Sequence, residues 1–132
     1  MVKKYYIGSL LVQRYGHLTI PRWYYSDIIF EPSANQILLT VSIPDGYLGY
    51  IYGFFISASE TNDFTINWID INDVSRSYRI VLAGKGSIQY ADIVPLNEGI
   101  PSKAGNIDFK IVNAGSTGSY YQVGLLVGDV YG

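Results

Sequence analysis

The chain has 132 residues, one histidine and no cysteine, and its 9 Lys and Arg against 11 Asp and Glu give a formal net charge of −2. The lack of cysteine excludes disulfides, thiolate nucleophiles and zinc–sulfur sites, and the only adjacent basic pair, Lys3-Lys4, argues against a nucleic-acid partner, which requires clustered cations. Hydrophobic residues make up 48% of the chain and charged residues only 15%, whereas about a quarter is usual in soluble domains. The length fits one domain over residues 1–132.

Short apolar runs recur along the chain between turn residues, and no window has the period of a helix. Such spacing predicts an all-β, single-domain antiparallel β-sandwich of about eight or nine strands. We expect these strands at 5–13, 23–31, 36–43, 47–57, 63–71, 77–82, 87–94, 106–113 and 119–130.

The first of these segments superficially resembles a signal peptide, because Lys3-Lys4 precedes the apolar run from Tyr5 to Val12. That run is short, contains Gly8 and lacks a small-residue cleavage site after it, so we expect a β-strand and no signal peptide. No stretch approaches the roughly 20 apolar residues of a membrane-spanning helix, so we expect no membrane span.

Three strands, at 36–43, 63–71 and 106–113, show the apolar–polar alternation of a half-buried antiparallel strand. In 63–71 the phase reverses at Ile69 and Ile71, which predicts a bulge or corner just after Trp68. The same-face positions of the alternating strands predict a core of Ile37, Leu39, Val41, Phe64, Ile66, Trp68, Tyr78, Ile80, Phe109, Ile111, Val123 and Leu125.

Three other segments, 5–12, 23–30 and 47–56, are apolar on both faces. In 47–56 we place Leu48, Tyr50, Tyr52, Phe54 and Ile56 on one face, and Ile51 and Phe55 on the other with Gly49 and Gly53. A sandwich core covers only one face of a strand, so the second face predicts a homo-oligomer, a trimer or a lattice subunit. The predicted interface consists of Tyr5, Tyr6, Trp23, Tyr24, Tyr25, Tyr47, Tyr50, Tyr52 and Phe55.

The sequence contains few groups that could carry out a reaction. His17 is the only histidine, so neither a catalytic triad nor a histidine-rich metal site is expected. Gly84-Lys85-Gly86 lacks the frame of a phosphate-binding loop, and we interpret it as a hairpin turn. The acidic segment Asp70 to Asp73 supplies oxygen ligands suited to calcium, but it lacks the EF-hand spacing, and a solvated turn is the preferred interpretation. We therefore expect no enzymatic activity, no cofactor and no metal.

The aromatic residues leave a second function open. Rings such as Trp23, Tyr24, Tyr50 and Tyr52 also suit a sugar-stacking platform, so the alternative to self-association is a carbohydrate-binding or receptor-binding β-sandwich module with exposed aromatics. The oligomeric mass would separate the two, because an obligate oligomer favours assembly and a monomer favours ligand binding.

The closing segment carries a family resemblance. A Pro-x-x-Ala-Gly sequence at 101–105, an alternating strand at 106–113, the Gly/Ser turn at 114–118 and a long apolar last strand resemble the terminal hairpin of jelly-roll virion proteins, the capsid, decoration and spike subunits of phages and archaeal viruses. The abundance of Tyr and Ile without Cys is similar to viral proteins from hot environments. The resemblance implies a jelly-roll sandwich and a structural role in a virion assembled in the host cytoplasm, with other virion proteins as partners.

Overall fold

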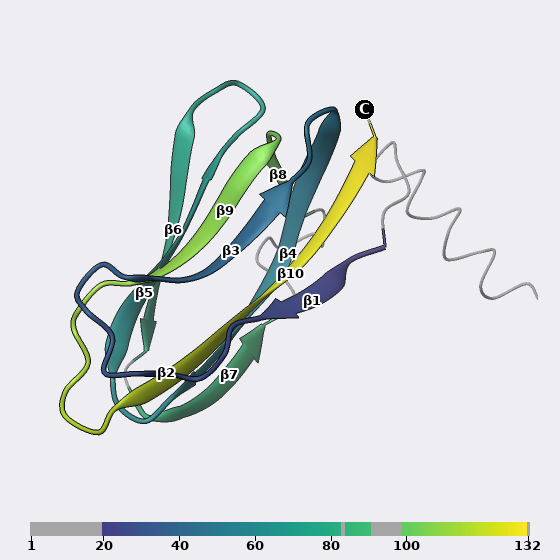
Figure 1. Cartoon of the computed structure of the whole chain (residues 1–132). Coiled ribbons are helices and arrows are strands. Elements are labelled where there is room, and N and C mark those ends of the chain that lie inside the picture. Colours follow the sequence, from purple (N-terminus) through teal and green to yellow (C-terminus); the bar gives the residue numbers. More distant parts are fainter. Residues whose placement is uncertain (1–19, 83, 91–98, 132) are drawn as a thin grey trace, which may run out of the picture.

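The computed structural model describes residues 20–82, 84–90 and 99–131, and these form an antiparallel β-sandwich. One sheet has six strands in the order β1-β10-β4-β7, with β2 also paired to β10 and β8 to β4; the other has four in the order β3-β9-β5-β6. The strands are β1 Arg22–Tyr25, β2 Ile29–Phe30, β3 Ile37–Ile43, β4 Tyr47–Ala58, β5 Asn62–Ile69, β6 Ser75–Leu82, β7 Gly86–Tyr90, β8 Ile100–Ser102, β9 Gly105–Ile111 and β10 Tyr120–Tyr131. In Figure 1, the long strands β4 and β10 run side by side along the molecule.

The predicted all-β sandwich is therefore confirmed, and its strands differ from the prediction in two ways within the described residues. The predicted strand 5–13 lies outside the described residues. The predicted strand 23–31 forms β1 and β2, two short strands on the same edge of β10. The short strand β8 was not predicted, because three residues that include Pro101 are too few to show a period. Within the described ranges, no helix has the length and apolar character needed to cross a bilayer.

The core lies between the two sheets, and Phe64 of β5 lies at its centre. Its ring meets Phe109 at a centroid distance of 6.1 Å and Tyr121 at 5.9 Å, both edge to face. Most predicted core residues are buried, and Leu39 and Tyr78 are partly buried against them. The buried predicted residues are Val41, Phe64, Ile66, Trp68, Ile80, Phe109, Ile111, Val123 and Leu125.

The prediction was wrong for Ile37, which is 49% exposed. Ile37 pairs with Lys110 and Leu39 pairs with Phe109, so two steps along β3 match one step along β9. The extra residue of this β-bulge is Leu38, which is buried in place of Ile37. A bulge reverses the phase of the strand before it, and that reversal turns Ile37 to the outside.

A second bulge corrects the predicted faces of β4. Ile51 pairs with Val127 and Gly53 pairs with Leu126 of β10, which leaves Tyr52 as the extra residue. Ile51 therefore shares the core with Phe54 and Ile56, and Leu48 and Tyr50 lie on the opposite face. The prediction that Leu48, Tyr50, Tyr52, Phe54 and Ile56 share one face was wrong, because it assumed an unbroken period of two.

Two further expectations concern turns. The predicted bulge or corner just after Trp68 was wrong, because β5 keeps its register with β6 as far as Ile69, which is 47% exposed, and residues 70–73 then form the β5–β6 turn. The interpretation of Gly84-Lys85-Gly86 as a hairpin turn was wrong. This segment connects β6 to β7, and the two strands lie in different sheets. β6 pairs with β5 in the four-stranded sheet, and β7 pairs with β4 in the six-stranded sheet.

A hydrogen-bonded cluster closes one end of the sandwich. The carboxylate of Glu60, which follows β4, accepts hydrogen bonds from Ser116 N at 3.0 Å, Ser116 Oγ at 2.5 Å and the Tyr121 hydroxyl at 2.8 Å. The hydrogen bonds from Ser116, followed by that from Tyr121, lower the pKa of Glu60. The cluster thus joins the β4–β5 connection to the loop before β10.

Candidate functional site

The outward face of the six-stranded sheet carries most of the predicted interface residues. Tyr25, Gly124 and Phe55 are register partners across β1, β10 and β4. Their neighbours Leu125 and Phe54 are buried in the core, so these three positions point away from it. We call the outward-facing side chains of this sheet the aromatic face, defined as Trp23, Tyr25, Tyr50, Tyr52, Phe55 and Leu126.

The ring of Tyr25 lies directly over Gly124. A Cβ atom at Gly124 would stand 2.7 Å from Tyr25 Cδ1, so only glycine allows the ring to lie this close to the strand. Tyr25 also meets Phe55 edge to face at 5.5 Å and stacks on Trp23 at 5.8 Å with an interplanar angle of 14°. These contacts fix three rings from two strands in a continuous layer.

A second part of the aromatic face lies along β4. Tyr50 and Tyr52 stack with their ring centroids 6.3 Å apart and an interplanar angle of 30°. The ring of Tyr52 also lies against Gly99, where an added Cβ would stand 2.7 Å from Tyr52 Cε1. Burial raises the pKa of Tyr50, because a partly desolvated phenol loses its proton less readily.

The outward positions of β1, β4 and β10 carry no Lys, Arg, Asp or Glu. On β10 these positions are Tyr120, Gln122, Gly124, Leu126, Gly128 and Val130, and on β4 and β1 they are apolar, aromatic or serine. The solvated face of an antiparallel sheet normally carries polar side chains. This composition is typical of the centre of a protein interface, where charge is depleted and tyrosine and tryptophan are enriched.

Two of the predicted interface residues lie elsewhere. Tyr24 pairs with Leu125 on the opposite side of β1 and is 40% exposed at the sheet edge. Tyr47 meets Tyr131 edge to face at 5.4 Å at the far end of β4, on the side opposite to Leu48. Tyr5 and Tyr6 lie outside the described residues.

Sequence reasoning missed Leu126 and the outward pair of Phe30 and Tyr120, whose ring centroids are 6.1 Å apart. The signal for them was the last strand, where Gly124 and Gly128 alternate with Leu126 on one face. That pattern identifies an outward face only when the partners of β10 are known.

The edge of this sheet is interrupted between β1 and β2. From Tyr25 to Ile29 the edge advances four residues while β10 advances three, from Gly124 to Tyr121. The side chain of Ser26 occupies the irregularity, and its Oγ accepts a hydrogen bond from Val123 N at 3.0 Å. Bulges of this kind protect an edge strand against unlimited strand addition, which favours contact through the face over contact through the edge.

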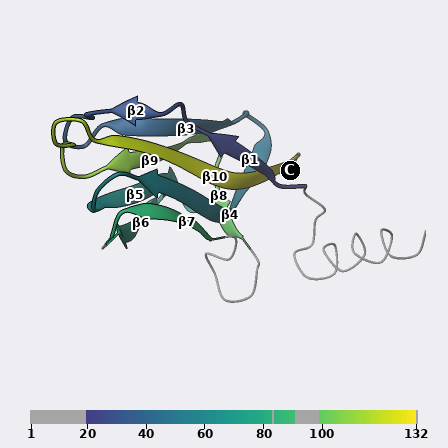
Figure 2. The same cartoon turned by 90° about the horizontal axis from the view of Figure 1, so that it is seen from below.

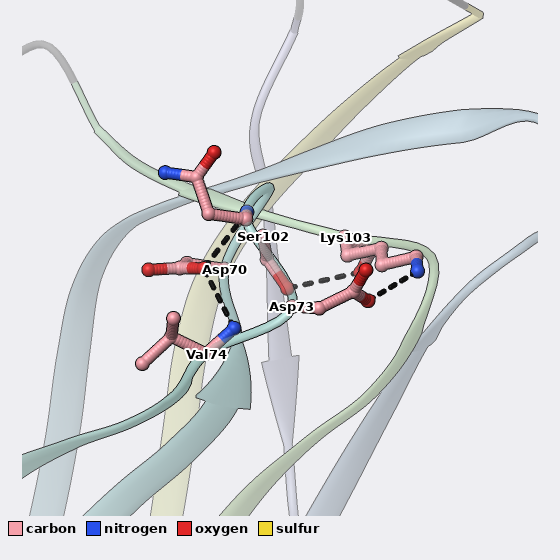
Figure 3. Close-up of polar contacts among 6 residues, drawn as sticks. Asp70, Asp73, Val74, Ser102 and Lys103 are labelled. Atoms are coloured by element: carbon pink, nitrogen blue, oxygen red, sulfur yellow. Dashed lines mark hydrogen bonds and ion pairs between the residues drawn. The ribbon is translucent and has the colours of Figure 1, made fainter.

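The acidic segment at 70–73 forms a turn whose carboxylates are already engaged (Figure 3). Asp70 Oδ1 accepts hydrogen bonds from Asn72 N at 2.9 Å and Val74 N at 3.0 Å, and Asp70 Oδ2 binds Arg76 Nε at 2.7 Å. The hydrogen bond from Arg76, aided by that from Val74 N, lowers the pKa of Asp70.

Asp73 forms an ion pair with Lys103, and Lys103 N donates to Ile69 O at 2.8 Å, so the turn is tied to the segment after β8. Among the described residues, no group of three or more His, Cys, Asp or Glu side chains could hold a metal ion. The hydrogen bonds and ion pairs of this turn therefore account for its two aspartates as structural residues. His17 lies outside the described part of the chain.

A scan against protein-family models finds no match for this chain, and a search of the curated proteins finds no similar sequence. Among solved structures, the chain is similar to the SPBc2 prophage-derived protein YomS, with a TM-score of 0.42 and 11% identity over 84% of this chain and 97% of that one. It is also similar to a chain in the structure of the infectious bursal disease virus Gx strain, with a TM-score of 0.40 and 15% identity. That match covers 86% of this chain and 32% of the viral one. With scores and identities this low, neither match defines what the chain does.

Proposed function

We propose that this protein is a non-enzymatic structural subunit that associates with further copies of itself through the aromatic face. The observation that supports the proposal most directly is the layer of Trp23, Tyr25 and Phe55 on an outward sheet surface without charged side chains. Monomeric proteins seldom leave contiguous apolar patches larger than a few hundred Å² in water.

The preorganisation of the face also supports the proposal. The rings of Tyr25 and Tyr52 lie against Gly124 and Gly99 and against neighbouring rings, so little side-chain entropy remains to be lost when a partner covers them. Rigid aromatic side chains are the usual anchors of interfaces that bury about 800 Å² per partner.

A second copy of the chain fits this face better than a charged partner. A surface without charged side chains cannot select a different protein through charge complementarity. Two copies of the same uncharged aromatic patch can pack against each other without electrostatic repulsion. The homo-oligomer, as a trimer or a lattice subunit, is therefore the preferred assembly.

The location in a virion, with other virion proteins as further partners, rests on the resemblance of residues 97–127 to the terminal hairpin of jelly-roll virion proteins. It is the more specific part of the proposal, and it can fail while self-association holds. An isolated particle that contains the protein, with the aromatic face protected from solvent, is the observation that would support it.

Sedimentation of the wild-type chain and of two variants tests self-association. Tyr25→Asp and Tyr50→Asp each place a charge in the aromatic face and should convert the oligomer to a monomer without unfolding it. Val81→Asp is the matched control, because Val81 is 64% exposed on a strand of the other sheet, and it should leave the mass unchanged.

A wild-type chain that sediments as a monomer at high micromolar concentration without any partner protein would contradict the proposal. The aromatic face would then be reinterpreted as the ligand platform of a carbohydrate-binding or receptor-binding module.

A further inference from the structure

The outward face of the four-stranded sheet carries a row of short polar side chains, one from each strand. The members are successive register partners across β3, β9, β5 and β6: Thr40, Asp108, Asn67 and Ser77. Long side chains such as Lys and Glu carry their charged groups far from the strand, whereas short Thr, Ser, Asn and Asp side chains hold their polar atoms close to the sheet with fewer rotamers available.

This row lies beside an open hollow of about 480 Å³. The hollow is lined by Asn67, Ile69, Ser75, Ser77, Asn106 and Asp108. Trp68 and Arg76 also border it, but the Trp68 ring packs in the core on the inner face of β5 and does not face into the hollow. Five polar side chains and one exposed isoleucine thus converge on one depression of the surface.

Two planar side chains of the hollow are each oriented by a hydroxyl from β3. The Thr40 hydroxyl donates to Asp108 Oδ1 at 2.7 Å. The Ser42 hydroxyl donates to Asn106 Oδ1 at 2.9 Å. These bonds leave the second carboxylate oxygen of Asp108 and the amide nitrogen of Asn106 without a partner among the described residues.

Asn67 is oriented in the same way by its own strand. Its amide nitrogen donates to Thr65 Oγ1 at 3.0 Å, which leaves its carbonyl oxygen unpaired among the residues that the structure describes. The hollow therefore offers a carboxylate acceptor at Asp108, an amide donor at Asn106 and an amide acceptor at Asn67, each on a side chain already fixed by a hydrogen bond.

That set of groups matches neighbouring hydroxyls on a ring. Each hydroxyl both donates and accepts a hydrogen bond, so it can donate to a carboxylate and accept from an amide at the same time. Ile69, which is 47% exposed, supplies an apolar surface for the C–H groups of the same ring.

The local charge favours a neutral ligand. Arg76 is held by Asp70 at 2.7 Å, so its guanidinium is already neutralised, and the lining residues contain no Lys or His. Asp108 is the remaining charged side chain of the lining, which disfavours phosphate and sulfate groups. We propose that the hollow binds a neutral carbohydrate, with adjacent hydroxyls on Asn67, Asn106 and Asp108 and the apolar side of the ring on Ile69.

Titration with glucose, galactose, mannose and N-acetylglucosamine at millimolar concentration tests the proposal in ¹H–¹⁵N spectra of the full chain. At least one sugar should give saturable shifts of the side-chain amides of Asn67 and Asn106. Asp108→Ala should weaken binding at least tenfold. Thr40→Val keeps the Asp108 carboxylate but removes the hydrogen bond that orients it, and it should weaken binding several-fold. Lys110→Ala, on the same face of β9 but outside the hollow, is the control and should bind as the wild type does.

Three outcomes would overturn the proposal. The first is that none of the four sugars shifts these signals saturably. The second is that Asp108→Ala binds as tightly as the wild type. The third is that the saturable shifts fall on Trp23 and the aromatic face, which would place the sugar on the other sheet. The hollow lies on the opposite sheet from the aromatic face, so Tyr25→Asp should not change sugar binding, and the two proposals can fail independently.

Discussion

The six-stranded sheet presents Trp23, Tyr25 and Phe55 to the outside, whereas the four-stranded sheet presents Thr40, Asn67 and Asp108. Both sheets contribute aromatic and aliphatic side chains to one shared core, so the inner faces are chemically alike. The outer faces are under no such packing constraint. Their difference is therefore the observation on which both proposals rest, a second copy of the chain at the aromatic face and a hydroxylated ligand at the polar face.

The two faces also differ in how their side chains are held. On the aromatic face, glycine positions let rings lie flat on the strands and stack on one another. On the polar face, hydroxyls from Thr40, Ser42 and Thr65 orient amides and a carboxylate. The side chains of each face are thus already ordered, by ring stacking on one face and by hydrogen bonds on the other. Figure 2 shows the strands of the sandwich from below. The following predictions test whether that division holds.

The largest expected effect separates the core from the aromatic face. Phe64→Ala should lower the free energy of unfolding by about 3–5 kcal/mol, because Phe64 is fully buried. Phe55→Ala should cost about 1 kcal/mol, the order of its edge-to-face contact with Tyr25. Urea denaturation at concentrations where the chain is monomeric measures both. Equal costs would show that Phe55 belongs to the core of the monomer rather than to an outer face.

Gly124→Ala should weaken self-association by about tenfold or more, equivalent to about 1.4 kcal/mol. The added Cβ would stand 2.7 Å from Tyr25 Cδ1 and 3.1 Å from the Tyr24 carbonyl oxygen, so the Tyr25 ring must leave its position on the strand. Gly84→Ala is the control, because a Cβ there meets nothing within 4 Å. Sedimentation at a series of concentrations gives the dissociation constants. An unchanged constant for Gly124→Ala would contradict the role of the Tyr25 ring.

Acid should unfold the sandwich without first weakening the aromatic face, whose outward positions hold no carboxylate. The hydrogen bonds to Glu60 and Asp70 lower the pKa of each carboxyl in the folded state. The unfolded chain then binds more protons, so this stabilisation is complete above the ordinary carboxyl pKa values and is lost as pH falls through the lowered folded values.

Thermal unfolding across that pH range measures the effect. Glu60→Gln should show a smaller loss of Tm between neutral and acidic pH than the wild type, and Asp45→Asn, which alters an exposed carboxylate on the β3–β4 turn, should follow the wild type. The oligomeric mass should stay constant until the fold melts. Dissociation at a pH where the fold is intact would mean that a titrating group contributes to the interface.

The smallest effect is expected on the polar face. Thr40→Val removes the exposed hydrogen bond to Asp108 and should change the free energy of unfolding by about 0.5 kcal/mol or less. It should leave the oligomeric mass unchanged. A cost above about 2 kcal/mol in chemical denaturation would show that the polar row supports the fold, and a change in mass would show that this face also takes part in assembly.

The predicted strands were most accurate where apolar and polar residues alternate without ambiguity, as in β5 and β9. The errors lie at apolar runs. Ile37, Leu38 and Leu39 are consecutive, so two phases fit the pattern equally well, and the pairing of β3 with β9 selects Leu38 for the core. Around Tyr52 the same ambiguity is resolved by the pairing of β4 with β10.

The two candidate sites differ in how far they could be foreseen. The aromatic face was predicted from strands that are apolar on both sides, because that excess is visible in the chain itself. The polar hollow was not predicted. Asn67 and Asp108 lie on different strands, and each is an ordinary solvated residue in its own strand until the register of β5 and β9 places them side by side.

The sequence alone determined the all-β class and most of the core, because alternation, turn residues and the absence of a helical period are local properties of the chain. Tertiary structure decided which apolar residue of a run faces inward, where the bulges fall and which polar side chains meet on a face. Those outcomes depend on pairing between strands far apart in the chain, and a shift of one residue in such a pairing moves every side chain of the strand to the opposite face.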